Sequence, residues 1–277
     1  MATREEISIP GFEQFAAVVK RRCGLDLYAY RAQQLERRLK CFMYQMGAPT
    51  LHEAAQAISR RDDALQQFID ALGINVTEFM RNRSLFDKLE KLLREMHARQ
   101  PIHKLWSAGC SIGCEPYSLA IIMDRIDPSR RWQILASDID REALNAARRA
   151  VFSEQYLKSL TSEEIRRYFT VTEDGWQFDR SLASRVRFSQ MDLLRDPYPA
   201  QCDVILCRNV IIYLDPEPRQ ALLARLAEAL RPGGILFIGG SESIGDAEKI
   251  GLEVVEPFFY RRKQRTWSAV VGWPRAA

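Results

Sequence analysis

Histidine is scarce in this chain, and no two cysteines have the spacing of a metal or redox site. The 277 residues include three histidines and six cysteines, and none of the cysteines form a C-x-x-C motif. Structural zinc sites and thiol–disulfide motifs usually show such spacing. We therefore expect neither a metal site nor a disulfide framework, and the scattered thiols favour a reducing compartment.

Long apolar segments are also missing. No apolar run approaches the ~18 residues that a membrane-spanning helix needs. The first ten residues, MATREEISIP, do not contain the apolar core of a signal peptide. These two features predict a cytoplasmic protein that does not insert directly into a membrane.

A large excess of one charge is absent overall but present locally. The 40 lysines and arginines exceed the 36 acidic residues by four, which is too little for a dedicated nucleic-acid-binding domain. Between residues 20 and 40, however, seven basic residues stand against only Asp26 and Glu36. Such a local excess favours a docking surface for an acidic partner. The basic residues are Lys20, Arg21, Arg22, Arg31, Arg37, Arg38 and Lys40.

Residues 1–73 show the periodicity of helices and no strand pattern. Apolar side chains at positions 35, 39, 42 and 46 recur in steps of four, three and four, which places them on one helical face. Gly47 follows as a helix stop, and Thr50 is a candidate N-cap for the next helix. A strongly charged helix is expected at about residues 84–99. The pattern predicts an all-helical N-terminal domain over 1–73 and a linker region over 74–100.

From residue 101 onward, short apolar segments alternate with helical segments. The apolar segments are KLWSA, WQILAS, VRFSQ, DVILCR and ILFIGG. This alternation predicts an α/β domain over 101–277, with a doubly wound, mostly parallel sheet and helices on both faces. Such sheets bind ligands beyond the carboxyl ends of their strands. Residues 153–185 interrupt the alternation with a short helix and a hairpin around residues 173–175, which predicts a small inserted β-subdomain.

The first strand of this domain leads into a glycine-containing loop, and the second ends in an aspartate. Gly109 and Gly113 let the backbone turn tightly and approach a ligand, and Pro116 suits the start of a helix whose N–H groups can bind an anion. Asp138 could accept hydrogen bonds from ribose hydroxyls or cap the next helix. The order of the two features favours a nucleoside ligand. The G-x-G-x-x-G fingerprint is absent, and both a dinucleotide and S-adenosylmethionine stay open at this point.

Longer strings resemble one family. LRPGG followed by ILFIGG is similar to S-adenosylmethionine-dependent methyltransferases, and further strings resemble the chemotaxis receptor methyltransferases (the CheR family) over nearly the whole chain. These strings are NVTEFMRNRSLF (75–86), LWSAGCSIGCEPYSLAI (105–121), ASDIDREAL (136–144), CDVILCRNVIIYLD (202–215) and LERRL (35–39). The resemblance implies a Rossmann-like class I methyltransferase fold, with S-adenosyl-L-methionine as the cofactor and S-adenosyl-L-homocysteine as its product.

The resemblance also implies the residues of the site. Arg81 would hold a carboxylate, either that of the incoming substrate or that of the cofactor, and Tyr213 would offer a hydrogen bond near the transfer point. Two departures from the family are Cys114, where many members have Glu, and Asp192, where some have Asn, which changes the polar group offered to adenine. The implied cofactor-binding residues are Asn75, Thr77, Arg81, Glu115, Asp138, Asp192, Leu193, Asn209 and Val210.

Methylation of receptor glutamates is the activity that the resemblance implies. A glutamate side chain with a pKa of about 4.3 is ionised at neutral pH, so the transfer needs no general base. Two other hypotheses are a methyltransferase acting on a small molecule or nucleic acid, and a catalytically silent adaptor. No N-P-P-Y-type string follows the fourth strand, which argues against the first. The joint presence of Arg81, Glu115, Asp138 and Asn209 argues against the second.

The expected partner is the cytoplasmic helical domain of methyl-accepting chemotaxis receptors, whose methylation helices are rich in Glu, and not nucleic acid. The helix at about residues 31–40 would dock this domain, because Leu35 and Leu39 face inward and leave basic side chains outside. The docking residues would be Arg31, Arg37, Arg38 and Lys40. We expect the protein to act as a monomer.

Some members of the resembled family use the β-subdomain to bind a C-terminal tether pentapeptide of the receptor by strand addition. In this chain the stretch between Phe169 and Val186 is short, and its one glycine, Gly175, is used by the turn. The bulky Trp176 follows at once and would occupy the edge where a peptide would lie. We therefore expect no binding of a tether pentapeptide.

Overall fold

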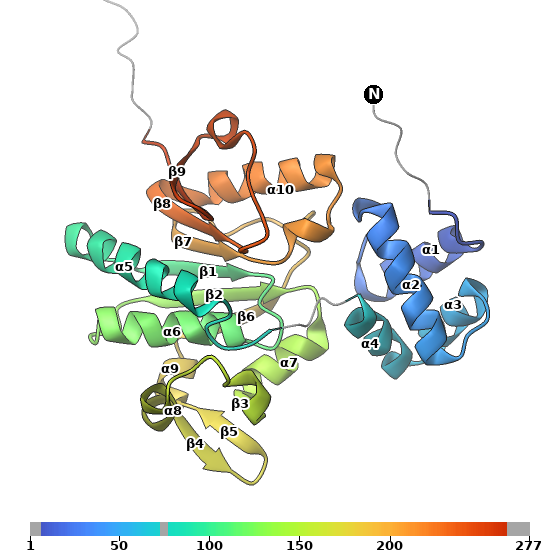
Figure 1. Ribbon diagram of the computed structural model, residues 1–277, viewed down its shortest axis with the longest axis horizontal. Coiled ribbons are helices and arrows are strands. Elements are labelled where there is room, and N and C mark those ends of the chain that lie inside the picture. The colour runs from blue at the N-terminus through green and yellow to red at the C-terminus, as the bar shows by residue number, and fades with distance from the viewer. Residues whose placement is uncertain (1–6, 73–76, 265–277) are drawn as a thin grey trace, which may run out of the picture.

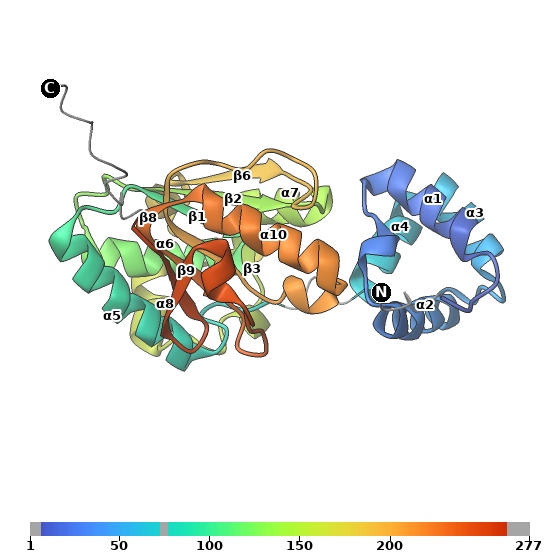
Figure 2. The same ribbon diagram turned by 90° about the horizontal axis from the view of Figure 1, so that it is seen from above.

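The computed structural model describes residues 7–72 and 77–264. Figures 1 and 2 show a cluster of N-terminal helices, α1 to α4, beside a larger domain built around a sheet. Within the two described ranges, none of the helices combines the length and the apolar character needed to cross a bilayer.

The N-terminal helices pack around three phenylalanines. Phe15, Phe42 and Phe68 come from three helices, and their ring centroids lie between 5.1 and 6.2 Å apart. Leu35 and Leu39 are buried, as the periodicity of the sequence predicts. This core is separate from that of the sheet domain. The elements are α1 (Phe12–Cys23), η1 (Leu27–Ala29), α2 (Ala32–Met46), α3 (Leu51–Arg60) and α4 (Asp62–Ala71).

The main sheet has seven strands in the order β6-β2-β1-β7-β8-β10-β9. The first five strands in this order are parallel, and β10 runs antiparallel to both β8 and β9. The strand order reverses between β1 and β7, so that the predicted doubly wound, mostly parallel sheet is confirmed. The strands are β1 (Lys104–Ala108), β2 (Gln133–Asp138), β6 (Val186–Gln190), β7 (Cys202–Cys207), β8 (Leu230–Ile238), β9 (Leu252–Glu256) and β10 (Phe259–Arg262).

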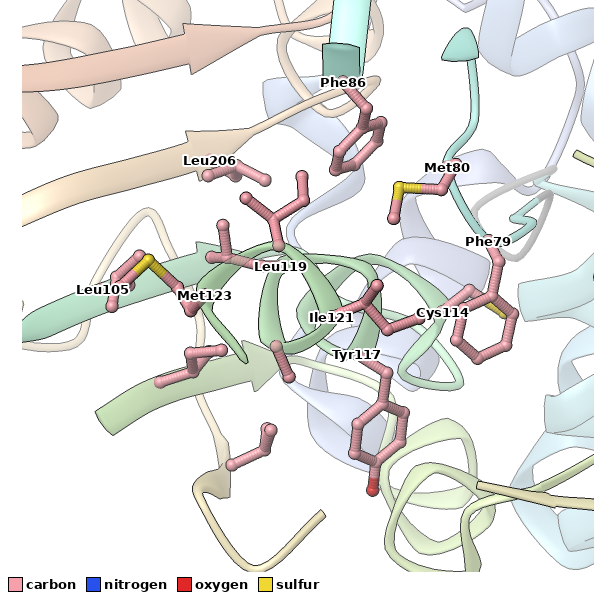
Figure 3. Close-up of a cluster of buried hydrophobic side chains, with 14 of the residues drawn as sticks. Phe79, Met80, Phe86, Leu105, Cys114, Tyr117, Leu119, Ile121, Met123 and Leu206 are labelled. Atoms are coloured by element: carbon pink, nitrogen blue, oxygen red, sulfur yellow. The ribbon is translucent and has the colours of Figure 1, made fainter. Parts of the chain in front are cut away.

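Helices cover both faces of this sheet. On one face, side chains of α6 meet those of β1 and β7, as Figure 3 shows for Leu119, Met123, Leu105 and Leu206. Helix α5 adds Phe86 and its apolar neighbours to the same core, so that the charged helix predicted at 84–99 forms a covering layer. Helix α10 packs on the opposite face. The helices are α5 (Arg83–Arg99), α6 (Cys114–Ile126), α7 (Arg141–Arg149) and α10 (Pro216–Ala229), with η4 (Ala247–Ile250) before β9.

The inserted β-subdomain is a three-stranded antiparallel sheet in the order β3-β5-β4. The predicted hairpin is confirmed, with Glu173 and Asp174 as its two turn residues, whereas β3 was not predicted. Phe79 fixes this sheet to the larger domain, because its ring lies edge-on to Phe152 and Phe169 at 4.8 and 5.0 Å. The elements are β3 (Val151–Phe152), η2 (Glu154–Tyr156), α8 (Ser162–Tyr168), β4 (Phe169–Thr172), β5 (Gly175–Phe178) and α9 (Arg180–Ala183).

The position of Trp176 corrects one sequence-based argument. Trp176 lies on the central strand β5, where its backbone pairs with Phe152 on one side and Val171 on the other. Its side chain is partly buried against the main core. The edge strands of this small sheet are β3 and β4, and Val171 on β4 is 66% exposed. Trp176 therefore does not occupy the edge that a peptide would join.

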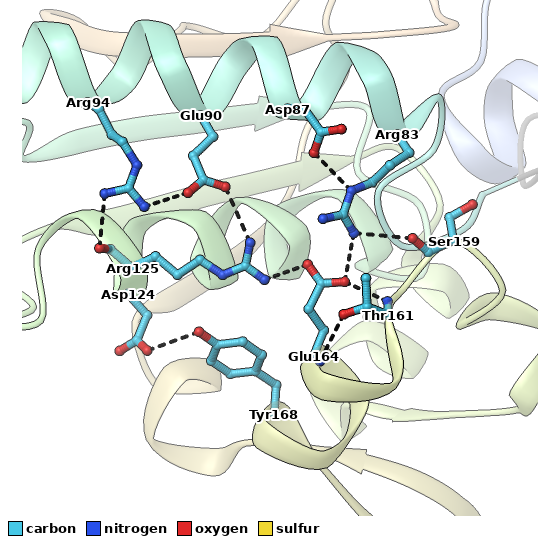
Figure 4. A network of polar contacts seen from close by, with 10 residues as sticks. All are labelled: Arg83, Asp87, Glu90, Arg94, Asp124, Arg125, Ser159, Thr161, Glu164 and Tyr168. Atoms are coloured by element: carbon cyan, nitrogen blue, oxygen red, sulfur yellow. Dashed lines mark hydrogen bonds and ion pairs between the residues drawn. The ribbon is translucent and has the colours of Figure 1, made fainter.

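A buried carboxylate ties the β-subdomain to α5 and α6 (Figure 4). Glu164 lies 2.7 Å from Nη1 of Arg83 and 2.5 Å from Nη2 of Arg125. It also accepts a hydrogen bond from the N–H of Thr161, which completes a capping box at the start of α8. Burial alone would raise the pKa of Glu164, but hydrogen bonds from the two arginines outweigh it and lower the pKa to about 2.

Candidate functional site

A cavity of about 310 Å³ opens beyond the carboxyl ends of β1 and β7, where the strand order reverses. This is the place where open α/β sheets bind their ligands. Asn75, which the resemblance includes in the site, lies outside the described residues. All of the other implied cofactor and catalytic residues line this one cavity, namely Thr77, Arg81, Glu115, Asp138, Asp192, Leu193, Asn209, Val210 and Tyr213.

The glycine-containing loop forms one wall, and its backbone requires glycine. Gly109 has a φ of +85°, and a Cβ atom there would lie 2.6 Å from Cγ2 of Val210. Gly113 has a φ of +94° and is the N-cap of α6, which begins two residues before Pro116. The N–H groups of Gly109 and Cys110 donate to the carbonyl of Ser137. The loop is thus held against β2 and passes close beneath the segment that follows β7.

Asp138 is buried beside this loop and is not a helix cap. Its Oδ2 accepts a hydrogen bond from the Ser111 N–H at 2.7 Å, and its Oδ1 accepts one from the Asp140 N–H at 3.0 Å. The N-cap of α7 is Asp140, whose side chain accepts from the N–H groups of Glu142 and Ala143. Burial raises the pKa of Asp138 to about 6. Because each carboxylate oxygen can accept more than one hydrogen bond, Asp138 can still accept from a ligand.

A second, mostly buried carboxylate, Glu115, lies at the start of α6, with its side chain 12% exposed. Its Oε1 accepts a hydrogen bond from the hydroxyl of Ser107 at 2.7 Å, and its Oε2 lies 3.6 Å from Nη1 of Arg208. Burial raises the pKa of Glu115, while the charge of Arg208 opposes that rise. Arg208 is 5% exposed and donates to the Arg81 carbonyl at 2.8 Å. The base of the cavity therefore holds paired charges away from water.

The loop after β6 contributes Asp192 and Leu193. Oδ1 of Asp192 accepts a hydrogen bond from the Leu194 N–H at 2.8 Å, and Oδ2 lies 3.7 Å from Nε of Arg195. The carbonyl of Leu193 accepts from Arg225 at 2.8 Å. These contacts fix the loop, with one oxygen of Asp192 committed to the loop's own turn.

The segment after β7 carries Asn209, Val210 and Tyr213, and it also contacts the N-terminal helices. Tyr213 belongs to the short helix η3 (Ile211–Tyr213), and its carbonyl accepts a hydrogen bond from the Arg31 N–H at 3.0 Å. The Asp215 N–H donates to the Ala29 carbonyl at 2.8 Å. The N-terminal helices therefore pair with the segment that forms one side of the cavity.

The four predicted docking residues on and beside α2 point in two directions. Arg38 lines the main cavity, and Arg31 and Arg38 both line a smaller cavity with Tyr213. Arg37 and Lys40 are exposed to solvent. The basic residues of this helix therefore extend from the mouth of the cavity to an open surface.

Several lining residues were not predicted from the sequence. Leu25, Asp26 and Tyr30 reach the cavity from the connection between α1 and α2. No local pattern marks them, because they meet segments that are distant in the sequence, as the bridge between Tyr30 and Leu214 shows. Arg208 belongs to the CRNV string, but the sequence did not predict a role for it. Among the residues that the structure describes, no group of three or more His, Cys, Asp or Glu side chains is arranged to hold a metal ion.

Comparison with known proteins places the chain in a family. It matches "CheR methyltransferase, all-alpha domain" over residues 10–72 and "CheR methyltransferase, SAM binding domain" over residues 75–257. The chain belongs to the CheR methyltransferase family. It is 37% identical over 258 residues to a chemotaxis protein methyltransferase of Listeria monocytogenes, covering 91% of this chain and 98% of the relative. A chemotaxis protein methyltransferase of Escherichia coli is 32% identical, with 90% of each chain covered.

Among solved structures, one described as "StiE O-MT residues 942-1257" is 16% identical to this CheR-family chain, with a TM-score of 0.36. The match covers 60% of this chain and 52% of that one.

The cofactor of this CheR-family methyltransferase is S-adenosyl-L-methionine, and the cavity fits it. Gly109 lines the cavity without a side chain, so that its backbone forms the wall at this point and packs against Val210. A buried carboxylate at Asp138 suits ribose hydroxyl groups, and a mostly buried carboxylate at Glu115 suits a cationic group. The cavity also holds apolar side chains, such as Leu193 and Leu222, for the adenine and the methylene groups.

Proposed function

We propose that this protein transfers a methyl group from S-adenosyl-L-methionine to glutamate side chains of chemotaxis receptors, giving γ-glutamyl methyl esters for sensory adaptation. The observation that carries the proposal is the shared cavity at the switch point. There, Arg81 and Tyr213 lie on the walls together with Asp138, and Arg38 reaches the same cavity from the N-terminal helices. One cavity thus brings together a carboxylate that suits ribose hydroxyl groups and cationic groups that suit an incoming carboxylate.

The cofactor would be held by residues from several strand ends. Asp138 would accept hydrogen bonds from the ribose hydroxyls, and Glu115 would face the cationic amino-acid end. Asp192 and Leu193 would contact the adenine, and the segment at Asn209 would lie beside the sulfonium. Asn75, Thr77 and Val210 complete the proposed set. When bound, the cofactor supplies an electrophilic methyl group on a positively charged sulfur.

The protein's part in the reaction is positioning and the exclusion of water. A glutamate carboxylate is already ionised at neutral pH, so that no residue needs to remove a proton. Arg81 would orient that carboxylate, or the carboxylate of the cofactor, through a charge-assisted hydrogen bond. Tyr213 would offer a hydrogen bond beside the transfer point. Holding the glutamate carboxylate oxygen in line with the methyl group would accelerate the transfer without general acid or base catalysis.

The receptor would dock on the N-terminal domain, proposed as residues 1–73. Arg31 and Arg38 would guide an acidic receptor helix towards the cavity, and Arg37 and Lys40 would meet its outer charges. Oppositely charged surfaces accelerate association and fix the register of the bound helix. We also propose that a tether pentapeptide is not bound, because only two residues join β4 and β5 of the β-subdomain.

Transfer of labelled methyl groups to receptor-containing membranes tests the proposal. We expect incorporation that depends on the protein and is released as methanol by mild base, because carboxyl methyl esters are base-labile. Arg81→Ala should abolish most of the incorporation, while the exposed Arg99→Ala serves as the matched control and should retain it. Label that resists base, or equal incorporation with membranes lacking receptors, would show that receptor carboxylates are not the substrate.

A further inference from the structure

Glu242 is a buried carboxylate just beyond the end of β8, and it does not line the cofactor cavity. Only 3% of the surface of Glu242 is exposed to solvent. Its partners are backbone groups: Oε2 accepts hydrogen bonds from the N–H of Gly239 at 2.5 Å and of Asn209 at 3.0 Å, and Oε1 accepts one from the N–H of Ile212 at 3.3 Å. A single side chain thus joins the end of β8 to the segment that follows β7.

The segment after β7 needs such a partner. Asn209 has a φ of +58°, a left-handed conformation that a non-glycine residue adopts only where its surroundings hold it there. The segment leaves β7 at Cys207 and enters the short helix η3 four residues later, so the N–H groups of Asn209 and Ile212 lie beyond the paired residues of β7. Buried N–H groups without a partner are costly. Glu242 accepts from two of them, at Asn209 and Ile212.

The sequence at the end of β8 is built to let this carboxylate approach. A Cβ atom on Gly239 would lie 2.6 Å from Oε2 of Glu242 and 3.0 Å from the nitrogen of Asn209. Any side chain at position 239 would therefore separate the carboxylate from the segment. This close packing is a second observation, independent of the hydrogen bonds, that the two segments are fixed against each other.

The far end of the same segment is held by different contacts. The Tyr213 carbonyl accepts from the Arg31 N–H, and the Asp215 N–H donates to the Ala29 carbonyl. Glu242 fixes the near end, and the N-terminal helices fix the far end. The segment held by these two sets of contacts carries Asn209, Val210 and Tyr213, which line the cavity.

We propose that Glu242 is a positioning residue for methyl transfer, which holds the segment from Asn209 to Tyr213 in the conformation that directs its side chains at the reacting groups. This inference rests on the proposed function for the roles of Asn209 and Tyr213. Glu242 acts through the backbone of the segment and touches neither cofactor nor substrate.

A carboxylate is required, because a carboxamide of the same shape cannot make the same bonds. The two oxygens of Glu242 accept from three N–H groups, whereas glutamine has one acceptor oxygen and an NH₂ donor. In Glu242→Gln the NH₂ group faces either the N–H of Ile212 or the N–H groups of Gly239 and Asn209. One attachment of the segment is then lost with almost no change in volume.

The experiment compares wild type with Glu242→Gln, and Glu248→Gln is the matched control because its side chain is 83% exposed. At saturating cofactor we expect kcat to fall at least tenfold in Glu242→Gln, which corresponds to about 1.4 kcal/mol, with KM for receptor unchanged. Glu248→Gln should behave as wild type. A folded Glu242→Gln variant with wild-type kcat, or one that loses only thermal stability, would overturn the inference.

Hydrogen exchange gives a readout that does not depend on the substrate. Peptides covering residues 208–213 should exchange at least tenfold faster in Glu242→Gln than in wild type, while peptides covering 105–113 should be unchanged. If Glu242→Gln does not fold, Glu242→Asp, which keeps the charge but is one methylene shorter, should show the same local effect. Equal exchange at 208–213 in wild type and folded variant contradicts the inference. Absence of receptor methylation by wild type would instead contradict the proposed function alone.

Discussion

Replacing Asp138 by Asn should weaken cofactor binding in a pH-dependent way. The carboxylate has a pKa of about 6 because it is buried, and ribose hydroxyl groups donate best to its ionised form. Loss of two hydrogen bonds to a charged group costs about 1.5–3 kcal/mol each at most. At pH 8, where Asp138 is ionised, we therefore expect the dissociation constant of Asp138→Asn to be at least tenfold above that of wild type.

The sign of the pH effect follows from the raised pKa. Binding that favours the ionised carboxylate weakens as the pH falls through about 6, since the proton competes with the ligand. At pH 5 only about one tenth of Asp138 is ionised, so the wild-type dissociation constant should rise about tenfold from its value at pH 8. The asparagine variant lacks this titration. The ratio of its dissociation constant to that of wild type should therefore be about tenfold smaller at pH 5 than at pH 8.

Isothermal titration calorimetry with S-adenosyl-L-methionine at pH 5, 6, 7 and 8 measures this effect. The ratio of variant to wild-type dissociation constants removes the titration of the ligand and of Glu115, which both proteins share. Melting curves of both proteins check that the fold is retained. A ratio near one at pH 8, or a ratio that does not change with pH, would refute the assignment of Asp138 to the ribose.

Three further predictions concern the loop, the docking helix and the β-subdomain. Gly109→Ala should raise the dissociation constant of the cofactor about tenfold, since its Cβ would lie 2.6 Å from a neighbouring valine and its φ of +85° costs an alanine about 1–2 kcal/mol. Calorimetry measures this constant. The control is Gly233→Ala, whose Cβ has no neighbour closer than 3.8 Å and which should bind the cofactor as wild type does. Arg38→Glu should raise KM for receptor roughly tenfold, which corresponds to about 1.4 kcal/mol. The increase should exceed that in Arg37→Glu, because Arg38 lines the cavity and Arg37 does not. Equal methylation kinetics in the two variants would count against this docking mode. The lowered pKa of Glu164 means that its ion pairs stabilise the fold above about pH 4.5 and that this contribution is lost as the pH falls towards about 2. Glu164→Gln should therefore lower Tm by several degrees at pH 7. A calorimetric scan with unchanged Tm at that pH would contradict the ion-pair account.

The parts of the fold that follow from local patterns were predictable. Alternation of strands and helices after residue 101 gave the parallel strands, and the periodicity at Leu35 and Leu39 gave the buried face of α2. Strands β9 and β10 were missed, because their pairing is antiparallel and depends on β8, a neighbour that no local pattern identifies. The LRPGG string follows the end of α10 at Ala229 and forms the first part of β8, where Leu230 pairs with Cys202.

The site was predictable where strand order dictates it and not where distant segments meet. Asp138 could be recognised because it ends a strand next to a glycine-containing loop, but the sequence could not separate it from the true cap, Asp140. The contribution of Tyr30 and Arg38 to the cavity depends on how the N-terminal helices pack against the segment at Tyr213. Trp176 was placed wrongly because a hairpin pattern does not say which strand becomes the centre of a sheet.

Mass spectrometric mapping of a receptor after incubation with this protein and S-adenosyl-L-methionine is the most direct test of the central claim. The account predicts peptides that gain the mass of one methyl group on glutamate side chains within the helical cytoplasmic domain of the receptor. The modification should require Arg81 and should disappear after mild base treatment. Methyl groups found on lysine, on nucleic acid or on no part of the receptor, with a protein that binds the cofactor, would contradict it.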